Sequence, residues 1–287
     1  MSNPFSLRIF VADGDPDGLR VVERSNWIGK ALIFPRALLP KVKQRDEMGQ
    51  TGVYLLLGPR DEGEGEKLYI GEGDPIRPRL ESHYAQKDFW TRAVCFVAAP
   101  GQLNKAHVQF LEANLVRLAK AAKRMPLDNG NAPTEPTLSE ADRADMLVFL
   151  HNMLGMLPVL GVQAFEQAPP ATAAAATLLT CKGKGVLATG YESSQGFVVK
   201  AGSHAVLDAV PSMQQHVRGM YELRQEVIGN GVLVRDGDGY RFSQDYVFSS
   251  PSAAATVVQG RSSNGRLDWK DAKGRTLKEL QAQEAAG

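Results

Sequence analysis

The chain of 287 residues is long enough for two domains, and its 43% hydrophobic and 23% charged residues are ordinary values for a globular protein. A formal net charge of +1 excludes a general attraction to nucleic acid, so any such binding must come from local basic patches. Cys95 and Cys181 lack the spacing of a zinc site or a redox motif. The sequence contains neither an apolar run of the roughly 20 residues needed for a membrane span nor the pattern of a signal peptide. We therefore expect a cytoplasmic protein without a membrane partner.

The first 50 residues predict a β-rich accessory segment. Alternating apolar residues predict strands at 6–12 and 19–24 around a tight turn. A third strand at 27–33 and a short basic helix at 35–43 follow. The aspartates of the turn could suggest a calcium loop, but the glutamate that such a loop carries at its twelfth position is missing. We expect this segment to pack beside the next domain.

Two strand-like segments that each place a tyrosine close to a glycine come next, at 51–57 and 67–70. The acidic, glycine-rich connection 58–66 is typical of a hairpin loop. Antiparallel pairing would bring Tyr54 and Tyr69 close together on one small sheet. Tyrosine is a good strand former, so the pair alone also fits an ordinary half-buried surface.

A helix is predicted directly after the second tyrosine strand. Asp74 can cap it, and Pro75 or Pro78 can occupy its first turn, where no backbone donor is lost. Arg79 and His83 lie four residues apart and share one face of this helix, which can be directed toward the sheet. The predicted buried stripe is Ile76, Leu80 and Tyr84.

A longer helix is predicted at 104–124. Glu112 lies within its apolar stripe, and an unpaired carboxylate is expensive to bury there. Glu112 therefore needs an arginine, a hydrogen-bond network or a metal ion, and the helix alone does not decide between an ion pair and a metal. The stripe itself is Val108, Leu111, Leu115, Leu118 and Ala122.

In their order along residues 51–131, these motifs resemble the GIY-YIG nuclease superfamily. The motifs are Gly52-Val53-Tyr54, Tyr69-Ile70-Gly71, Arg79 with His83, Glu112 in Phe110-Leu111-Glu112-Ala113, and Asn129 in Pro126-Leu127-Asp128-Asn129. The first motif differs from the Gly-Ile-Tyr of the family name only at Val53, which stands in place of the isoleucine. The resemblance implies an α+β fold, with a small mixed β-sheet flanked by helices, and metal-dependent endonuclease activity on phosphodiester bonds of DNA. It also implies Mg²⁺, or another divalent cation such as Mn²⁺, as cofactor.

The resemblance assigns roles to the aromatic residues of the site. Tyr54 and Tyr69 would border the active site, and His83 stands where the family carries a histidine or a tyrosine. A tyrosine base needs a pKa lowered from about 10, whereas a histidine titrates near 6.5. We favour Tyr54 as the general base, with Tyr69 and His83 hydrogen-bonding around the phosphate; His83 as the base is the alternative.

The resemblance also assigns roles to the polar residues. Arg79 would contact the scissile phosphate and stabilise the charge that gathers on its oxygens. Glu112 would hold the divalent metal, since magnesium accepts a single carboxylate together with water and phosphate. Asn129 would help to shape the site, with Asn131 as an alternative for that role.

Two groups of basic residues are candidates for DNA binding, although each could equally be a solvated face. The first surrounds the Arg79 helix: Arg77, Lys87 and Arg92. The second ends the following helix: Arg117, Lys120, Lys123 and Arg124. DNA is the favoured substrate, RNA is the alternative, and the biological role could be restriction, defence or repair.

The C-terminal half predicts a separate α+β domain at 178–287. A helix capped at Ser139 and an alanine- and proline-rich linker at 167–177 precede it. Short strands, a helix at 212–229 with two arginines, a hairpin around 236–239 and a helix after Ser250-Pro251 follow. Residues 178–280 are similar to the uncharacterised domain that often follows GIY-YIG nucleases in bacteria. We expect a DNA- or partner-binding module.

The predicted domains are thus an accessory segment at 1–50, a nuclease core at 51–135, a helical segment with its linker at 136–177, and the C-terminal domain. A second hypothesis is a non-cleaving nucleic-acid or partner-binding protein on a GIY-YIG scaffold. The presence of all five motifs favours the nuclease, since a retired enzyme could lose Arg79 or Glu112 without losing its fold.

Overall fold

The computed structural model describes residues 4–61, 65–168, 177–183 and 185–286. The chain forms two compact units, Met1–Glu166 and Gln167–Gly287, and each is described by itself. The boundary falls at the start of the predicted linker, of which residues 169–176 lie outside the described residues. No helix in the described ranges is both long enough and apolar enough to cross a membrane.

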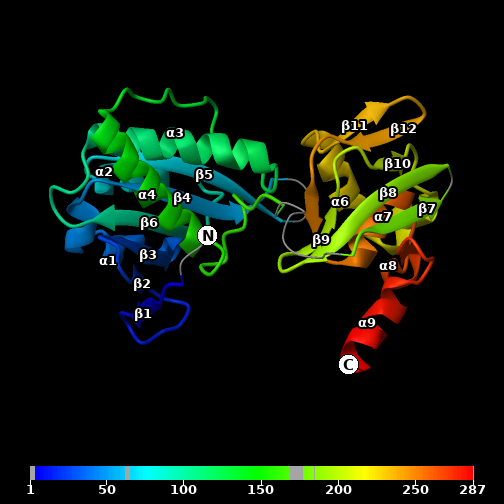
Figure 1. Cartoon of the computed structure of the whole chain (residues 1–287). Coiled ribbons are helices and arrows are strands. Elements are labelled where there is room, and N and C mark those ends of the chain that lie inside the picture. Colours follow the sequence, from blue (N-terminus) through cyan, green and yellow to red (C-terminus); the bar gives the residue numbers. More distant parts are fainter. Residues whose placement is uncertain (1–3, 62–64, 169–176, 184, 287) are drawn as a thin grey trace. The chain divides into compact units, whose positions relative to one another are not determined.

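The N-terminal unit is built on one six-stranded sheet in the order β1-β2-β3-β6-β4-β5, in which all neighbouring strands are antiparallel (Figure 1). The strands are β1 (Leu7–Val11), β2 (Arg20–Arg24), β3 (Gly29–Pro35), β4 (Gly52–Pro59), β5 (Glu66–Gly73) and β6 (Arg92–Ala98). The expected mixed sheet is therefore an antiparallel one. Its one parallel element among the described residues is an isolated bridge between Leu68 and Leu127.

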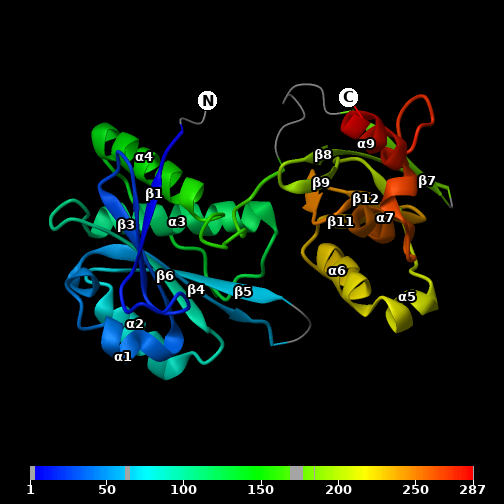
Figure 2. The same cartoon turned by 90° about the horizontal axis from the view of Figure 1, so that it is seen from below.

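Helices cover both faces of this sheet (Figure 2). Along β4, Val53 and Leu55 point toward α3 and α4, while Tyr54 and Leu56 point toward α1 and α2, because successive strand residues face opposite ways. Both faces are buried, so β4 is apolar throughout rather than alternating. The helices are α1 (Leu39–Val42), α2 (Arg77–Gln86), α3 (Lys105–Ala122) and α4 (Glu140–Met156), with 3-10 turns at Arg36–Leu38 and Asp46–Gly49.

The N-terminal segment is part of the central sheet. β3 pairs with β6 over its whole length, from Gly29↔Ala98 to Pro35↔Arg92, so β1–β3 extend the sheet that carries the tyrosine strands. The helix predicted after Ser139 is α4, which Ser139 caps. α4 buries Met146, Phe149, Met153 and Met156 in the core that it shares with α3.

α2 begins later and faces differently than the sequence predicts. The helix starts at Arg77 without a side-chain cap, and Asp74 instead accepts a hydrogen bond from Thr51 Oγ1 at 2.6 Å. Tyr84 lies on the surface, and the third buried position is His83. Positions i, i+4 and i+7 remain on one side of a 3.6-residue helix, so His83 follows Ile76 and Leu80 into the core.

The C-terminal unit contains two antiparallel sheets with helices packed on them. Its three-stranded sheet has the order β10-β12-β11, and its five-stranded sheet the order β13-β9-β8-β7-β14. The strands are β7 (Leu179–Gly183), β8 (Val186–Ser193), β9 (Gly196–Val199), β10 (His204–Val206), β11 (Leu233–Asp236), β12 (Gly239–Phe242), β13 (Tyr246–Phe248) and β14 (Trp269–Lys270). The helices are α5 (Pro211–His216), α6 (Arg218–Gly229), α7 (Pro251–Gln259), α8 (Gly265–Asp268) and α9 (Leu277–Ala286).

The helix predicted at 212–229 is two helices, since Val217 leaves the helical conformation with φ −138° and ψ 53°. Arg224 of α6 is 2% exposed and donates to the carbonyl oxygens of Val257 and Val206. This arginine therefore supports the fold, because its donors are used inside the unit. Arg218 is exposed and forms an ion pair with Glu222 at 2.8 Å.

Candidate functional site

The two tyrosines lie on neighbouring strands at the β5 edge of the sheet. Tyr54 pairs across the strands with Gly71, and Tyr69 pairs with Leu56, so both rings lie on the α2 face with centroids 6.4 Å apart. Gly71 makes room for the first ring: a Cβ there would lie 2.5 Å from Cζ and from the hydroxyl oxygen of Tyr54. Glycine at this position therefore allows the Tyr54 phenol to lie directly over β5.

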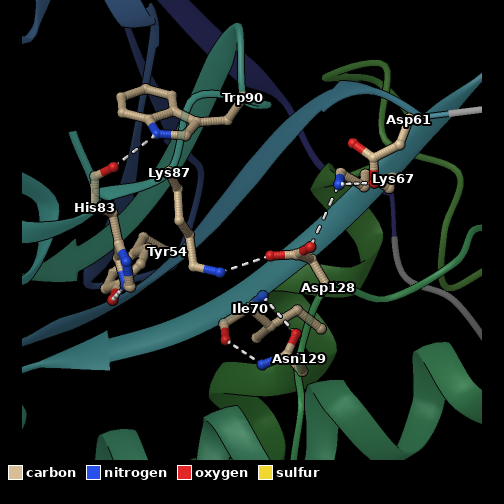
Figure 3. Close-up of polar contacts among 9 residues, drawn as sticks. All are labelled: Tyr54, Asp61, Lys67, Ile70, His83, Lys87, Trp90, Asp128 and Asn129. Carbon is tan, nitrogen blue, oxygen red and sulfur yellow. Dashed lines mark hydrogen bonds and ion pairs between the residues drawn. The ribbon is translucent and has the colours of Figure 1, made fainter. Parts of the chain in front are cut away.

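α2 brings His83 and Arg79 to the tyrosines. His83 Nε2 lies 2.9 Å from the hydroxyl oxygen of Tyr54 (Figure 3). The His83 ring also meets the Tyr69 ring edge-on, with centroids 4.7 Å apart. The Arg79 guanidinium, one turn earlier, interacts with the hydroxyl groups of Tyr54 and Tyr69. The four side chains predicted on two strands and one helix thus meet at one place.

Arg36 holds the C-terminal end of α2. Its Nη2 donates to the carbonyl oxygens of Tyr84 at 2.7 Å and Lys87 at 3.3 Å, which satisfies groups that a helix end leaves unpaired. The same guanidinium lies over the rings of Tyr84 and Trp90. Arg36 belongs to a distant segment of the chain, so no local pattern around α2 reveals its role.

The segment that follows α3 lies along the outer edge of β5. Asn129 Oδ1 accepts from the backbone N–H of Ile70 at 3.0 Å, and Asn129 Nδ2 donates to the carbonyl oxygen of Ile70 at 2.7 Å (Figure 3). The N–H of Leu68 donates to Pro126, and the N–H of Asp128 donates to Leu68. Asn129 rather than Asn131 makes these bonds, so it holds β5 in place one residue before Gly71.

Lys87 lies over the second tyrosine, where an aspartate holds it. Its Nζ is 2.6 Å from Oδ2 of Asp128 and 4.7 Å from the centroid of the Tyr69 ring. Lys67 approaches the other oxygen of Asp128 at 3.4 Å (Figure 3). Lys87, which was predicted to face DNA, is therefore already paired, and Asp128 is a neighbour of the site to which no local pattern points.

Glu112 lies on α3, which starts with a capping box formed by Asn104 and His107. Burial raises the pKa of its carboxyl group to about 7, and the charge of Glu72 adds to the shift, while Arg79 and Lys105 oppose it. Glu72 itself is paired with Lys105 at 2.6 Å. Within the described ranges, no hydrogen bond or ion pair satisfies Glu112.

The aromatic and imidazole groups are neutral at physiological pH. Burial raises the pKa of Tyr54 far above its ordinary value, and Tyr69 adds to this effect, while Arg79 opposes it. Burial lowers the pKa of His83 to about 4, with help from the charges of Arg79 and Lys87. The Tyr54–His83 contact therefore joins a phenol to a neutral imidazole, which together can pass on one proton.

The residues present fit a divalent cation that keeps most of its waters better than one that is enclosed by protein ligands. The described part of the chain contains no cluster of three or more His, Cys, Asp and Glu side chains that could enclose a metal ion. Mg²⁺ keeps several waters and commonly uses only one or two carboxylates together with substrate phosphate. A half-buried carboxylate without a protein partner, such as Glu112, suits that role.

Two of the remaining basic residues have acidic neighbours. Arg92 is paired with Glu66 at 2.9 Å and donates to Gly161, on the sheet face that α3 and α4 cover. Arg124 lies 4.0 Å from Glu166.

Three other residues predicted to bind DNA lie on helices of the site. Arg77 is exposed in the first turn of α2, and Lys120 is exposed on α3. Lys120 is eight residues beyond Glu112, or about 12 Å along the helix axis. Lys123 caps the C-terminal end of α3 in the left-handed conformation, with φ 53°.

Comparison with protein families matches residues 179–281 to a domain of unknown function, DUF4357. This match agrees with the separate C-terminal domain predicted at about 178–280. Neither the curated proteins nor the solved structures include a match to the chain. The resemblance of residues 51–131 to GIY-YIG nucleases stays a prediction.

Proposed function

We propose that the N-terminal unit is a metal-dependent nuclease that hydrolyses phosphodiester bonds of DNA. The observation that carries this proposal is the meeting of Tyr54, Tyr69, His83, Arg79 and Glu112 at one edge of the sheet. They come from β4, β5, α2 and α3. Two phenols, an imidazole, a guanidinium and a carboxylate provide the charge and proton transfer that phosphodiester hydrolysis requires.

Arg79 would bind the scissile phosphate. Its guanidinium is exposed, so a phosphate can reach it, and it lies beside the hydroxyl groups of both tyrosines. A fixed positive charge stabilises the transition state more than the ground state, because negative charge gathers on the phosphoryl oxygens as the bond breaks. Arg79 thus contributes to catalysis as well as to binding.

Tyr54 would take a proton from the attacking water as its own proton passes to His83. The 2.9 Å contact between them provides the path, and the neutral state of His83 leaves a ring nitrogen able to accept. Tyr69 packs against His83 and keeps the ring in place. A divalent cation held by Glu112 would polarise the phosphate and lower the pKa of its bound water.

The state of Glu112 favours an enzyme over a scaffold that only binds. Burying a carboxylate without a partner lowers the stability of the fold. A protein that only binds nucleic acid does not need such a carboxylate at Glu112 of α3. A cation and a phosphate oxygen would supply the missing partners. We therefore rank the non-cleaving hypothesis second.

The test is cleavage of supercoiled plasmid and of single-stranded DNA and RNA, with Mg²⁺, with Mn²⁺ and with a chelator. Wild type should cut only with a divalent cation. Glu112→Gln should lose more than about 100-fold in rate while it still binds nucleic acid, since it removes a transition-state contact. Glu135→Gln is the matched control, because Glu135 is a carboxylate outside the site that pairs with Arg143.

Cleavage by Glu112→Gln at the wild-type rate would remove the metal assignment. Binding without cleavage by wild type under every condition would favour the non-cleaving hypothesis.

We further propose that the C-terminal unit binds DNA or a protein partner. With Arg224 buried, this rests on its exposed basic residues, such as Arg218.

A further inference from the structure

β1 is the outermost strand of the six-stranded sheet, at the edge opposite β5 (Figure 1). In the described part of the chain, only β2 pairs with it. Ile9 and Phe10 are 51% and 59% exposed, and they point to opposite faces of the sheet. Natural edge strands are usually protected by charge, proline or a covering element, so an open apolar edge indicates a strand that pairs with another chain.

The hydrogen bonds of the β1–β2 hairpin decide which backbone groups face outward. The N–H of Ala12 donates to Leu19 at 2.9 Å, and the carbonyl oxygen of Ser6 accepts from Ser25 at 3.0 Å. The even-numbered residues of β1 therefore bond to β2, and the residues between them direct both backbone groups away from it. These outward-facing residues are Leu7, Ile9 and Val11.

We propose that β1 pairs antiparallel with β1 of a second copy of this chain, with Ile9 opposite Ile9. In this register Leu7 lies opposite Val11 of the second copy, and the reverse pair follows by the two-fold axis. Each of the three pairs exchanges two backbone hydrogen bonds. The two sheets then form one continuous sheet across the axis.

The side chains suit this register on both faces. Leu7, Ile9 and Val11 share the face of Val22, which is buried in the core beneath α3 and α4, so one face of the contact is apolar. On the other face Arg8 would lie opposite Phe10 of the second copy, where a guanidinium and an aromatic ring attract each other. A net charge of +1 adds little repulsion between two copies.

This self-complementarity is why we assign the edge to a second copy rather than to an unrelated strand. In antiparallel orientation, β1 of the second copy supplies the backbone donors and acceptors and the side chains that β1 needs. A contact of one short strand buries less than about 1,200 Å², which is typical of weak association. We expect a dissociation constant on the order of 10 µM.

Sedimentation equilibrium of the full-length protein, from about 1 to 100 µM, tests the proposal. Ile9→Pro removes an N–H that faces outward, and proline is tolerated at such edge positions. Ile9→Lys is a second variant that leaves the backbone unchanged. Both should weaken association by at least about tenfold. Ile28→Lys is the matched control, since Ile28 is 56% exposed but lies outside β1, and it should associate as wild type does.

A wild type that stays monomeric at the highest concentration would overturn the proposal. Unchanged association of both Ile9 variants would overturn it as well, as would an equal loss in Ile28→Lys. An Ile9→Cys variant adds a direct measurement of the register, because Cys95 and Cys181 are both buried. A short thiol cross-linker should join two copies through residue 9, and failure to do so in the associated protein would exclude this register.

Discussion

Replacing Glu112 with glutamine should make the metal-free protein more stable above neutral pH. The pKa of this carboxyl group is about 7 in the folded protein, against an ordinary value of 4.5. Below pH 4.5 both the folded and the unfolded state keep the proton, so the substitution changes little. Between pH 4.5 and 7 the unfolded state releases its proton first, and the free energy of unfolding of wild type falls as pH rises.

The size of the effect follows from these two values. Their difference corresponds to at most about 3 kcal/mol above pH 7. Glu112 is only half-buried, and solvent screening reduces this to about 1–2 kcal/mol. For a unit of this size, such a gain raises the melting temperature by about 2–8 °C.

The assay is thermal or urea unfolding at about pH 5 and about pH 8, on either side of the folded-state pKa, with a chelator present. Glu112→Gln should be more stable than wild type at the higher pH and nearly equal to it at the lower. When millimolar Mg²⁺ replaces the chelator, the melting temperature of wild type should rise and that of the variant should not. A ligand that binds only the folded state stabilises that state.

Glu135→Gln is again the control, and it should show no gain at the higher pH, because Glu135 already has a partner in Arg143. Two results would refute the inference that Glu112 is buried without a partner. One is a Glu112→Gln protein that is less stable than wild type at the higher pH. The other is a stability difference between the variant and wild type that is the same at both pH values.

Three further predictions address the site and the two units. Tyr54→Phe should fold normally and cut about 10²–10⁴-fold more slowly, and a near-normal rate would transfer the role of base to His83 or Tyr69. Gly71→Ala should cost about 1–3 kcal/mol of stability and most of the activity, because the new Cβ overlaps the Tyr54 ring, whereas Gly130→Ala has open space and should change neither. A chain of residues 1–166 should fold, keep the metal-dependent cleavage, and bind DNA more weakly with a shallower salt dependence; an equal salt slope would exclude DNA binding by the C-terminal unit.

Local patterns in the sequence were sufficient for the elements that carry the site. The tyrosine strands, the hairpin between them and the long helix with Glu112 in its stripe all occur close to their predicted positions. These features depend on side-chain periodicity and on turn residues, which are local properties of the chain. The capping of α7 by Ser250 is another example, since the cap and the N–H that it accepts from are three residues apart.

Tertiary structure decided which of the charged residues are available. Lys87, Arg92 and Arg224 all looked like surface residues, but their partners come from segments far along the chain: Asp128, Glu66 and the carbonyl oxygens of β10 and α7. No local pattern encodes such distant partners.

The order of the strands in the sheet likewise could not be predicted from the sequence. β6 lies between β3 and β4, and this placement joins the N-terminal segment to the tyrosine strands in one sheet. The motifs, their spacing and the elements that carry them depend on neighbours within a few residues, so they can be predicted from the chain's local patterns. Strand order, the burial of His83 in place of Tyr84, and the partners of each charge depend on contacts between segments that are distant in the chain, so they are seen only in the folded protein.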